Sequence, residues 1–142
     1  MVTEKQIEVR YPEADSMGIV PHSVYAVWYE VARMDYFDKV GFPYADMHRL
    51  GIDPPMVNLN VSFKAPVSYP GTVTIRTWCE AFGPKKLKLR YETYDGAGAL
   101  VNSAETFHIW TGPDGKSLRI CDALPEVYEK FRAAAGGDRE TL

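Results

Sequence analysis

The chain has 142 residues, 46% of them hydrophobic and 25% charged, with a formal net charge of −3. This length and composition are typical of one globular domain with a real core, so we expect a single domain over residues 1–142 with a tail that frays from about residue 136. No hydrophobic run approaches the ~20 residues of a membrane span, the N-terminus lacks a signal-peptide pattern, and the negative net charge argues against a nucleic-acid-binding protein. Cys79 and Cys121 lack CxxC spacing, which favours reduced thiols in a cytoplasmic protein over a metal site.

The first third of the chain predicts one strand and one long helix. Ile7, Val9 and Tyr11 alternate with charged residues, which predicts a strand that Pro12 ends. Residues 24–40 are apolar on nearly every face and predict a helix that begins near residue 21 and ends at Gly41. A helix this apolar is expected to be surrounded by other elements. A short second helix is predicted for residues 44–50.

From residue 56 the pattern changes to alternation with period two. It predicts strands over residues 56–63, 72–80, 87–94 and 100–111, joined by short turns, then a short segment at 116–120 and an amphipathic helix at 124–135. Short hairpin connections make such a sheet antiparallel. The order of elements therefore predicts an α+β fold in which a curled sheet covers one helix, with an edge left for a second subunit.

The loop before the long helix holds the residues most suited to chemistry. Asp15 is followed by Gly18, and Pro21 and His22 open the helix. Unpaired backbone N–H groups at a helix start carry partial positive charge and suit a developing oxyanion. The layout can therefore place a carboxylate opposite an oxyanion hole.

The same region supplies a recognisable set of residues: Tyr11, Asp15, Gly18, Ile19, Val20, His22, Tyr25 and Glu30. At these spacings the set resembles the hotdog-fold acyl-CoA thioesterases, in particular the 4-hydroxybenzoyl-CoA thioesterase and YbgC-like branch. Residues 57–75 resemble that family's second strand and its following turn, and the resemblance extends over about residues 7–131. Pro21 and Val24 depart from the family's usual residues, so the identity of the acyl group is not predicted.

The resemblance implies hydrolysis of an acyl-CoA to a carboxylic acid and free CoA, without a cofactor or metal. Asp15 would attack the thioester or deprotonate a water, the His22 backbone N–H would hold the oxyanion, and Gly18 would let the loop approach closely. It also implies a homodimer at least, with a homotetramer typical of this branch. The expected substrate-binding residues are Tyr25, Trp28 and Tyr29 for the acyl group, and Lys85, Lys86 and Lys64 for the CoA phosphates.

Each of these roles has a structural alternative. Asp15 alone would be an Asx-turn residue, the aromatic residues core, and the lysines a solvated strand face. Glu30 either faces a partner's site or pairs with Arg33, and the spacing favours the pair. His48 and His108 are interpreted as structural. At the level of function, the alternatives are a non-catalytic module that binds acyl thioesters and a hotdog hydratase or dehydratase.

Overall fold

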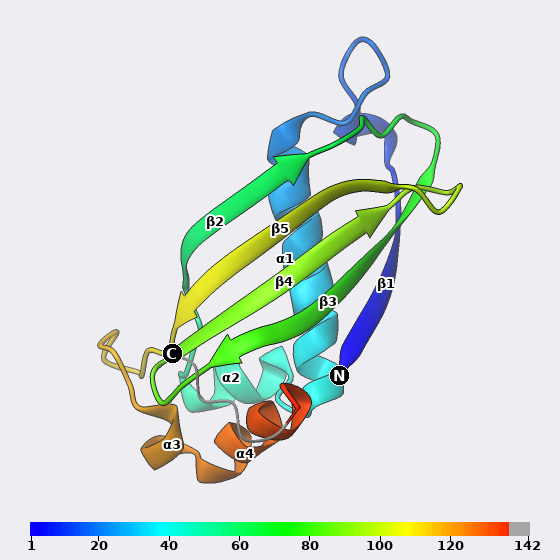
Figure 1. Ribbon diagram of the computed structural model, residues 1–142. Helices are drawn as coiled ribbons and strands as arrows, with labels where there is room; N and C mark the ends of the chain where they lie inside the picture. The colour runs from blue at the N-terminus through cyan, green and yellow to red at the C-terminus, as the bar shows by residue number, and fades with distance from the viewer. Residues whose placement is uncertain (137–142) are drawn as a thin grey trace.

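The computed structural model describes residues 1–136, and the predicted fraying tail beyond them lies outside the described residues. One antiparallel sheet lies in front of a long helix, with short helices gathered at one end (Figure 1). The strands are β1 (Val2–Glu8), β2 (Met56–Phe63), β3 (Thr72–Phe82), β4 (Lys86–Tyr94) and β5 (Leu100–Ile109), in the order β1-β3-β4-β5-β2. The helices are α1 (His22–Val40), α2 (Tyr44–Leu50), α3 (Ile120–Ala123) and α4 (Pro125–Ala134), with a 3₁₀ turn at Tyr11–Glu13.

This architecture confirms the predicted α+β fold, a curled sheet of five strands around one long helix. Short turns join β3 to β4 and β4 to β5, so each of these strands pairs with the next one along the chain. β2 and β1 form the two edges, each reached by a longer connection. Among residues 1–136, no helix is long and apolar enough to cross a membrane.

Helix α1 begins and ends where the sequence predicts. Pro21 precedes it in an extended conformation, and Gly41 ends it at φ 100°, a left-handed conformation that glycine adopts without steric cost. Its largest buried side chains, which include Trp28 and Phe37, pack against the sheet. The expectation that other elements surround this apolar helix is confirmed for the face that packs on the sheet, while Val27 and Val31 remain exposed.

One further prediction is corrected by the structure. The first strand spans Val2–Glu8 rather than residues 7–11, because β3 starts at Thr72, opposite Glu8, and beyond this pair the Val9 N–H donates to the Gly71 carbonyl outside the paired strands. The alternation continues past the strand into the 3₁₀ turn, whose first turn accepts Pro12. The predicted short segment at 116–120 contains an isolated bridge between Thr111 and Ser117, and its last residue, Ile120, begins α3.

A chain of buried polar groups crosses the inside of the sheet. Arg33 Nη1 donates to the Tyr91 hydroxyl (3.1 Å), which lies 2.9 Å from Thr106 Oγ1, and Thr106 Oγ1 lies 2.8 Å from His108 Nε2. His108 Nδ1 lies 2.8 Å from the Pro54 carbonyl, so the proton belongs on Nδ1. A neutral His108 then gives every acceptor in the chain one donor. Its structural interpretation is confirmed.

His108 should make stability depend on pH. Burial, together with the Arg33 charge, lowers the pKa of His108 from 6.5 to about 4. Below pH 6.5 the unfolded chain therefore binds a proton that the folded chain does not accept until about pH 4, so stability falls as pH falls through this window. The loss from this one group amounts to about 3 kcal/mol.

Denaturant unfolding of wild type and His108→Gln between pH 4 and 7 checks this expectation, since the variant should lose less stability at low pH. The exposed His48→Gln serves as the control. Parallel pH curves for wild type and His108→Gln would contradict a buried neutral histidine.

Candidate functional site

The Asp15 loop is held by its own carboxylate. Asp15 Oδ1 accepts hydrogen bonds from the backbone N–H groups of Met17 (2.8 Å) and Ile19 (3.0 Å), and Gly18 turns the chain at φ 75°. The Asx-turn alternative is therefore correct as a description of the loop. Asp15 Oδ2 accepts no hydrogen bond from any residue in the described range 1–136, and the side chain is exposed. One carboxylate oxygen thus fixes the loop while the other stays available.

The same arrangement occurs at a second place. In the turn between β4 and β5, Asp95 Oδ1 accepts from Ala97 N and Ala99 N, both at 2.9 Å, and Gly98 takes φ 82°. The backbone bonds also match, since Asp15 N and Asp95 N each donate to the carbonyl four residues ahead. Asp95 therefore provides an internal copy of the Asp15 loop at a hairpin.

The start of α1 borders a cleft of roughly 290 Å³. The His22 ring stacks on Phe63, with ring centres 3.9 Å apart and planes 16° apart, and Tyr25 and Lys64 also line the cleft. No side chain caps this helix start, and the backbone N–H of His22 has no acceptor among the described residues. The cleft therefore offers an open helix N-terminus beside aromatic surface.

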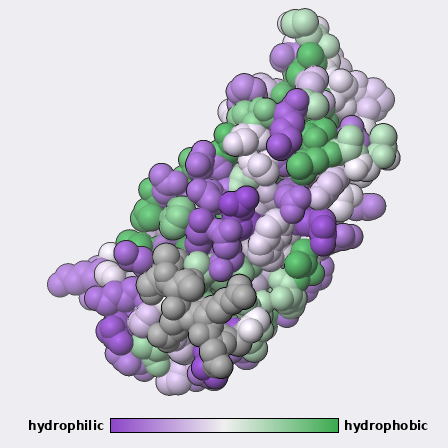
Figure 2. All heavy atoms as spheres, in the orientation of Figure 1, coloured by the Kyte–Doolittle hydropathy of each residue, from purple (hydrophilic) through white to green (hydrophobic). Residues whose placement is uncertain are grey.

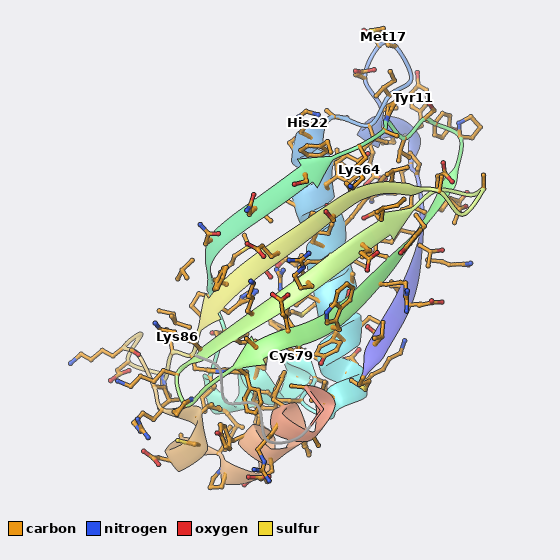
Figure 3. The ribbon with its side chains drawn as sticks, in the orientation of Figure 1. Tyr11, Met17, His22, Lys64, Cys79 and Lys86 are labelled. Atoms are coloured by element: carbon orange, nitrogen blue, oxygen red, sulfur yellow. The ribbon has the colours of Figure 1, made fainter. Side chains whose placement is uncertain are left out.

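Asp15 and Gly18 line a neighbouring hollow of roughly 430 Å³, together with Tyr11 and Tyr69. Ile19 and Val20 line the cleft and directly follow Gly18, which lines the hollow. The Val20 N–H donates to the Val67 carbonyl, and Ile19 forms a bridge with Ser68. Figure 3 places Tyr11, Met17, His22 and Lys64 at this one end of the molecule. The carboxylate and the helix start are thus neighbours on one short segment.

Trp28 and Tyr29 lie in the core rather than at the cleft. The Trp28 indole N–H donates to Glu13 Oε2 (2.9 Å), and the Tyr29 hydroxyl donates to Asn102 Oδ1 (2.5 Å). Both side chains are almost fully buried. Within one protomer they support the helix, and of the three predicted acyl-pocket residues only Tyr25 reaches the cleft.

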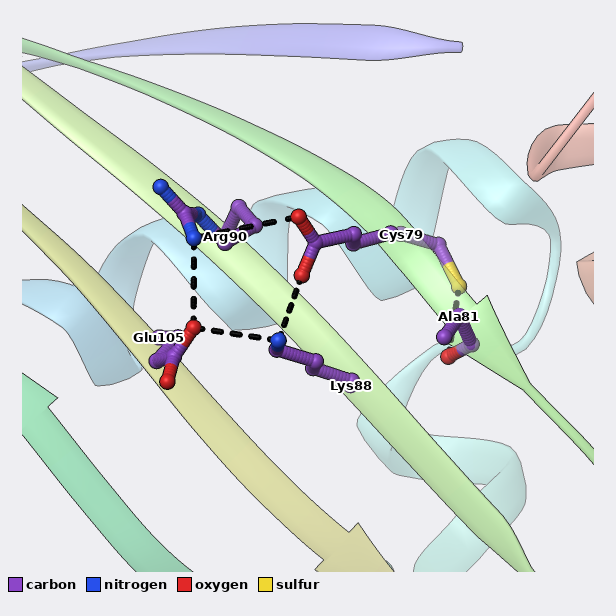
Figure 4. A network of polar contacts seen from close by, with 6 residues as sticks. Cys79, Ala81, Lys88, Arg90 and Glu105 are labelled. Atoms are coloured by element: carbon purple, nitrogen blue, oxygen red, sulfur yellow. Dashed lines mark hydrogen bonds and ion pairs between the residues drawn. The ribbon is translucent and has the colours of Figure 1, made fainter. Parts of the chain in front are cut away.

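The basic run on β4 divides into free and paired residues. Lys88 and Arg90 are bound to Glu80 and Glu105 in one network on the outer face of the sheet (Figure 4). Lys85 and Lys86 are exposed and form no ion pair with any residue in the described range 1–136. Figure 3 shows Lys86 at the opposite end of the sheet from His22. One protomer therefore does not bring these lysines to the Asp15 loop.

The predicted pair between Glu30 and Arg33 is wrong. Arg33 turns inward to the Tyr91 hydroxyl, whereas Glu30 stays on the exposed side of α1. Their spacing of three residues allows an ion pair, but Arg33 is buried against the sheet, so its guanidinium lies away from solvent.

Sequence reasoning missed Phe63 as a site residue. It was included only as one apolar position of an alternating strand, and the stacking on His22 comes from the approach of α1 to the end of β2. Within residues 1–136 no three His, Cys, Asp or Glu side chains are grouped so as to hold a metal ion.

Comparison with known proteins gives consistent matches. A family model described as "Thioesterase superfamily" matches residues 17–102. YneP of Bacillus subtilis, provisionally named as an acyl-CoA thioesterase, is 39% identical over 134 residues, covering 94% of this chain and 97% of that protein. The 4-hydroxybenzoyl-CoA thioesterase of Pseudomonas sp. is 28% identical over 131 residues, covering 87% and 93%. The crystal structure of a DHNA-CoA thioesterase from Staphylococcus aureus superposes with a TM-score of 0.89 at 35% identity, covering 99% of each chain.

The matched family and relatives, together with the curled sheet around α1, make the chain a thioester hydrolase of the hotdog fold. The chain belongs to the thioesterase superfamily. This confirms the family resemblance drawn from residues 11–30.

Proposed function

We propose that this acyl-CoA thioesterase uses the Asp15 carboxylate and the His22 backbone N–H to hydrolyse its substrate. The observation that carries the proposal is the divided role of the carboxylate: Oδ1 is held by the N–H groups of Met17 and Ile19, while Oδ2 has no partner in the described range 1–136. A fixed carboxylate with one free oxygen is suited to attack or to proton abstraction.

The thioester would lie across residues 19–20, between the cleft and the Asp15 hollow. Its carbonyl oxygen would accept a hydrogen bond from the His22 N–H at the positive end of α1. Gly18, which has no side chain, would let the thioester approach the loop closely. If Asp15 attacks, its Oδ2 bonds to the carbonyl carbon, CoA thiolate leaves, and water hydrolyses the resulting anhydride. If Asp15 is a base, it takes a proton from water, which adds to the carbon before the thiolate departs. A single turnover in ¹⁸O-labelled water separates these routes.

The cleft favours a flat or apolar acyl group, because Tyr25 and Phe63 form much of its wall. A hydratase or dehydratase is less well supported, since such chemistry needs a histidine oriented by an acid. The His22 ring instead stacks on Phe63, without a carboxylate bonded to it in the part of the chain described. A binding module without turnover remains the alternative that activity measurements exclude or establish.

We propose that the active form is at least a dimer paired through β2. β2 is an edge strand exposed on both faces, with Leu59 at 37% and Phe63 at 40% exposure on the side of α1. Val27 and Val31 of α1 are exposed as well. A second copy would cover the edge, as edge strands require. A tetramer would add contacts through the outer face of the sheet, whose middle is largely hydrophilic (Figure 2).

A two-fold axis that pairs β2 with its copy exchanges the two ends of the strand. The end of the partner sheet that carries Lys85 and Lys86 would then lie on the same side as the Asp15 loop. These two lysines and Lys64, which lines the cleft, are the proposed contacts of the CoA phosphates.

We also propose a cytoplasmic location, since Cys79 and Cys121 are both free thiols. Cell fractionation checks this expectation.

Asp15→Asn should abolish activity without unfolding the loop. The amide oxygen still accepts from Met17 and Ile19, but the free oxygen and the charge are lost, so turnover should fall at least roughly 10²-fold. Thiol release from a panel of aromatic, short-chain and long-chain acyl-CoAs measures this.

Asp95→Asn is the matched control, because it makes the same change in the same loop motif. It should change the melting temperature by the same small amount as Asp15→Asn and leave turnover unchanged. Equal activity in both variants would assign Asp15 to the loop alone.

Leu59→Lys should dissociate the dimer. A charged side chain on the apolar edge costs more free energy when a partner subunit covers it than when it is exposed to water. Light scattering should give at least twice the 16.0 kDa chain mass for wild type and a mass near one chain for the variant, with activity reduced. Val2→Lys on the opposite edge is the control. A wild type of one chain mass that is fully active would contradict the dimer.

Joint replacement of Lys85 and Lys86 by Ala should raise KM for acyl-CoA by roughly threefold to tenfold and leave kcat unchanged, because exposed ionic contacts are individually weak. Added salt should raise the wild-type KM more than that of the variant. The same acyl group on N-acetylcysteamine, which lacks phosphates, is the control. If wild type had the same KM for the CoA ester as for the N-acetylcysteamine ester, Lys85 and Lys86 would not contribute to substrate binding.

A further inference from the structure

The oxyanion donor proposed above stands at a helix start without a capping side chain. Pro21 precedes α1 in an extended conformation, and the His22 backbone N–H has no acceptor among residues 1–136. Helix ends fray where such groups lack partners. A backbone donor stabilises an oxyanion only when it is already held about 2.7–3.1 Å from that oxygen. A contact other than a cap therefore has to fix residue 22.

The His22 side chain makes such a contact. Its ring stacks on the Phe63 ring, with ring centres 3.9 Å apart and planes 16° apart. The His22 ring forms no hydrogen bond or ion pair with any residue in the range 1–136. A ring held flat against a neighbour fixes the direction of its Cα–Cβ bond, and this restricts the backbone rotation that would turn the N–H of the same residue away. The stack is therefore suited to fix the donor.

Phe63 offers a surface that is itself fixed. It ends β2, and the backbone N–H groups of the next two residues, Lys64 and Ala65, both donate to the Val101 carbonyl (2.8 and 3.1 Å). The buried Tyr25 ring also packs against Phe63, with ring centres 5.5 Å apart and planes 68° apart. Phe63 is therefore the anchored member of the stacked pair, and His22 is the member that it holds.

We propose that Phe63 is a positioning residue for the thioesterase reaction: its ring holds the His22 ring and, through it, the backbone N–H that binds the oxyanion. This inference rests on the proposed function. It assigns no proton transfer to the His22 imidazole, since any flat ring at residue 22 would serve. It also makes the donor depend on the edge strand β2, because the residue that holds it ends that strand.

The test separates the ring of His22 from its backbone N–H. His22→Ala keeps the N–H and loses the stack, so kcat should fall roughly threefold to tenfold, the usual worth of one aromatic pair. Phe63→Leu should lower kcat by a similar factor. The double variant should lose no more than either single variant, because both substitutions remove the same contact. His22→Phe restores a flat ring and should recover most of the kcat lost in His22→Ala.

Two readouts separate positioning from a contact with the acyl group, since Phe63 also lines the cleft. Loss of positioning lowers kcat by the same factor for a short-chain and an aromatic acyl-CoA, because the oxyanion is the same in both. Loss of a wall contact acts mainly on KM for the aromatic ester. ¹⁵N relaxation gives the order parameter of the residue-22 amide, which should be about 0.85 in wild type and His22→Phe and below about 0.6 in His22→Ala.

Phe107→Leu is the control, because the Phe107 ring lies beside Lys88 on the outer face of the sheet. It should leave kcat and the order parameter unchanged. If Phe63→Leu does not fold, the comparison of His22→Ala with His22→Phe carries the test.

Wild-type kcat in His22→Ala overturns the role of Phe63. So does a His22→Phe variant as slow as His22→Ala, which would assign a role to the imidazole itself, and so do losses that multiply in the double variant. In each of these cases wild type still hydrolyses its substrate and Asp15→Asn does not. Absence of turnover on every ester overturns the proposed function itself.

Discussion

One long helix packs on a sheet of five strands, and the strand order decides which part of the sheet remains exposed. Helix α1 packs over β1 and β3, while β2 at the opposite edge is exposed on both faces. The exposed strand β2 and the open cleft beside Phe63 are consequences of this one shortage of cover. A chain of this size can bury that surface by pairing with a second copy of itself.

The Asp15 loop combines a structural motif with the carboxylate proposed for catalysis. The same pattern of Asp, Gly and backbone hydrogen bonds also closes the hairpin at Asp95. What differs is the setting: Asp15 precedes an uncapped nineteen-residue helix, whereas Asp95 joins two strands. The loop motif therefore supplies rigidity, and the helix that follows supplies the electrostatic partner.

The fold was largely predictable because its signals are local. Period-two alternation located β2 to β5, and Gly41 and Pro21 bounded α1. The start of β1 was misplaced because alternation alone does not reveal where the partner strand ends. In the site, Asp15, Gly18 and His22 follow from their order before the helix, but the stacking of Phe63 and the inward turn of Arg33 depend on contacts between residues far apart in the chain. No local pattern encodes such contacts.

The protomer separates the parts of its own chemistry. The carboxylate and the helix start lie at one end of the sheet, and Lys86, which forms no ion pair within residues 1–136, lies at the other. Each set is incomplete alone, because the cleft lining contains no lysine or arginine besides Lys64 among the described residues. In the proposed dimer, an axis through β2 would exchange the two ends and bring one protomer's carboxylate towards its partner's lysines. The exposed edge strand and the separation of the lysines from the carboxylate would then have one common explanation, because the edge that pairs the two copies would also bring these two parts of the proposed site together.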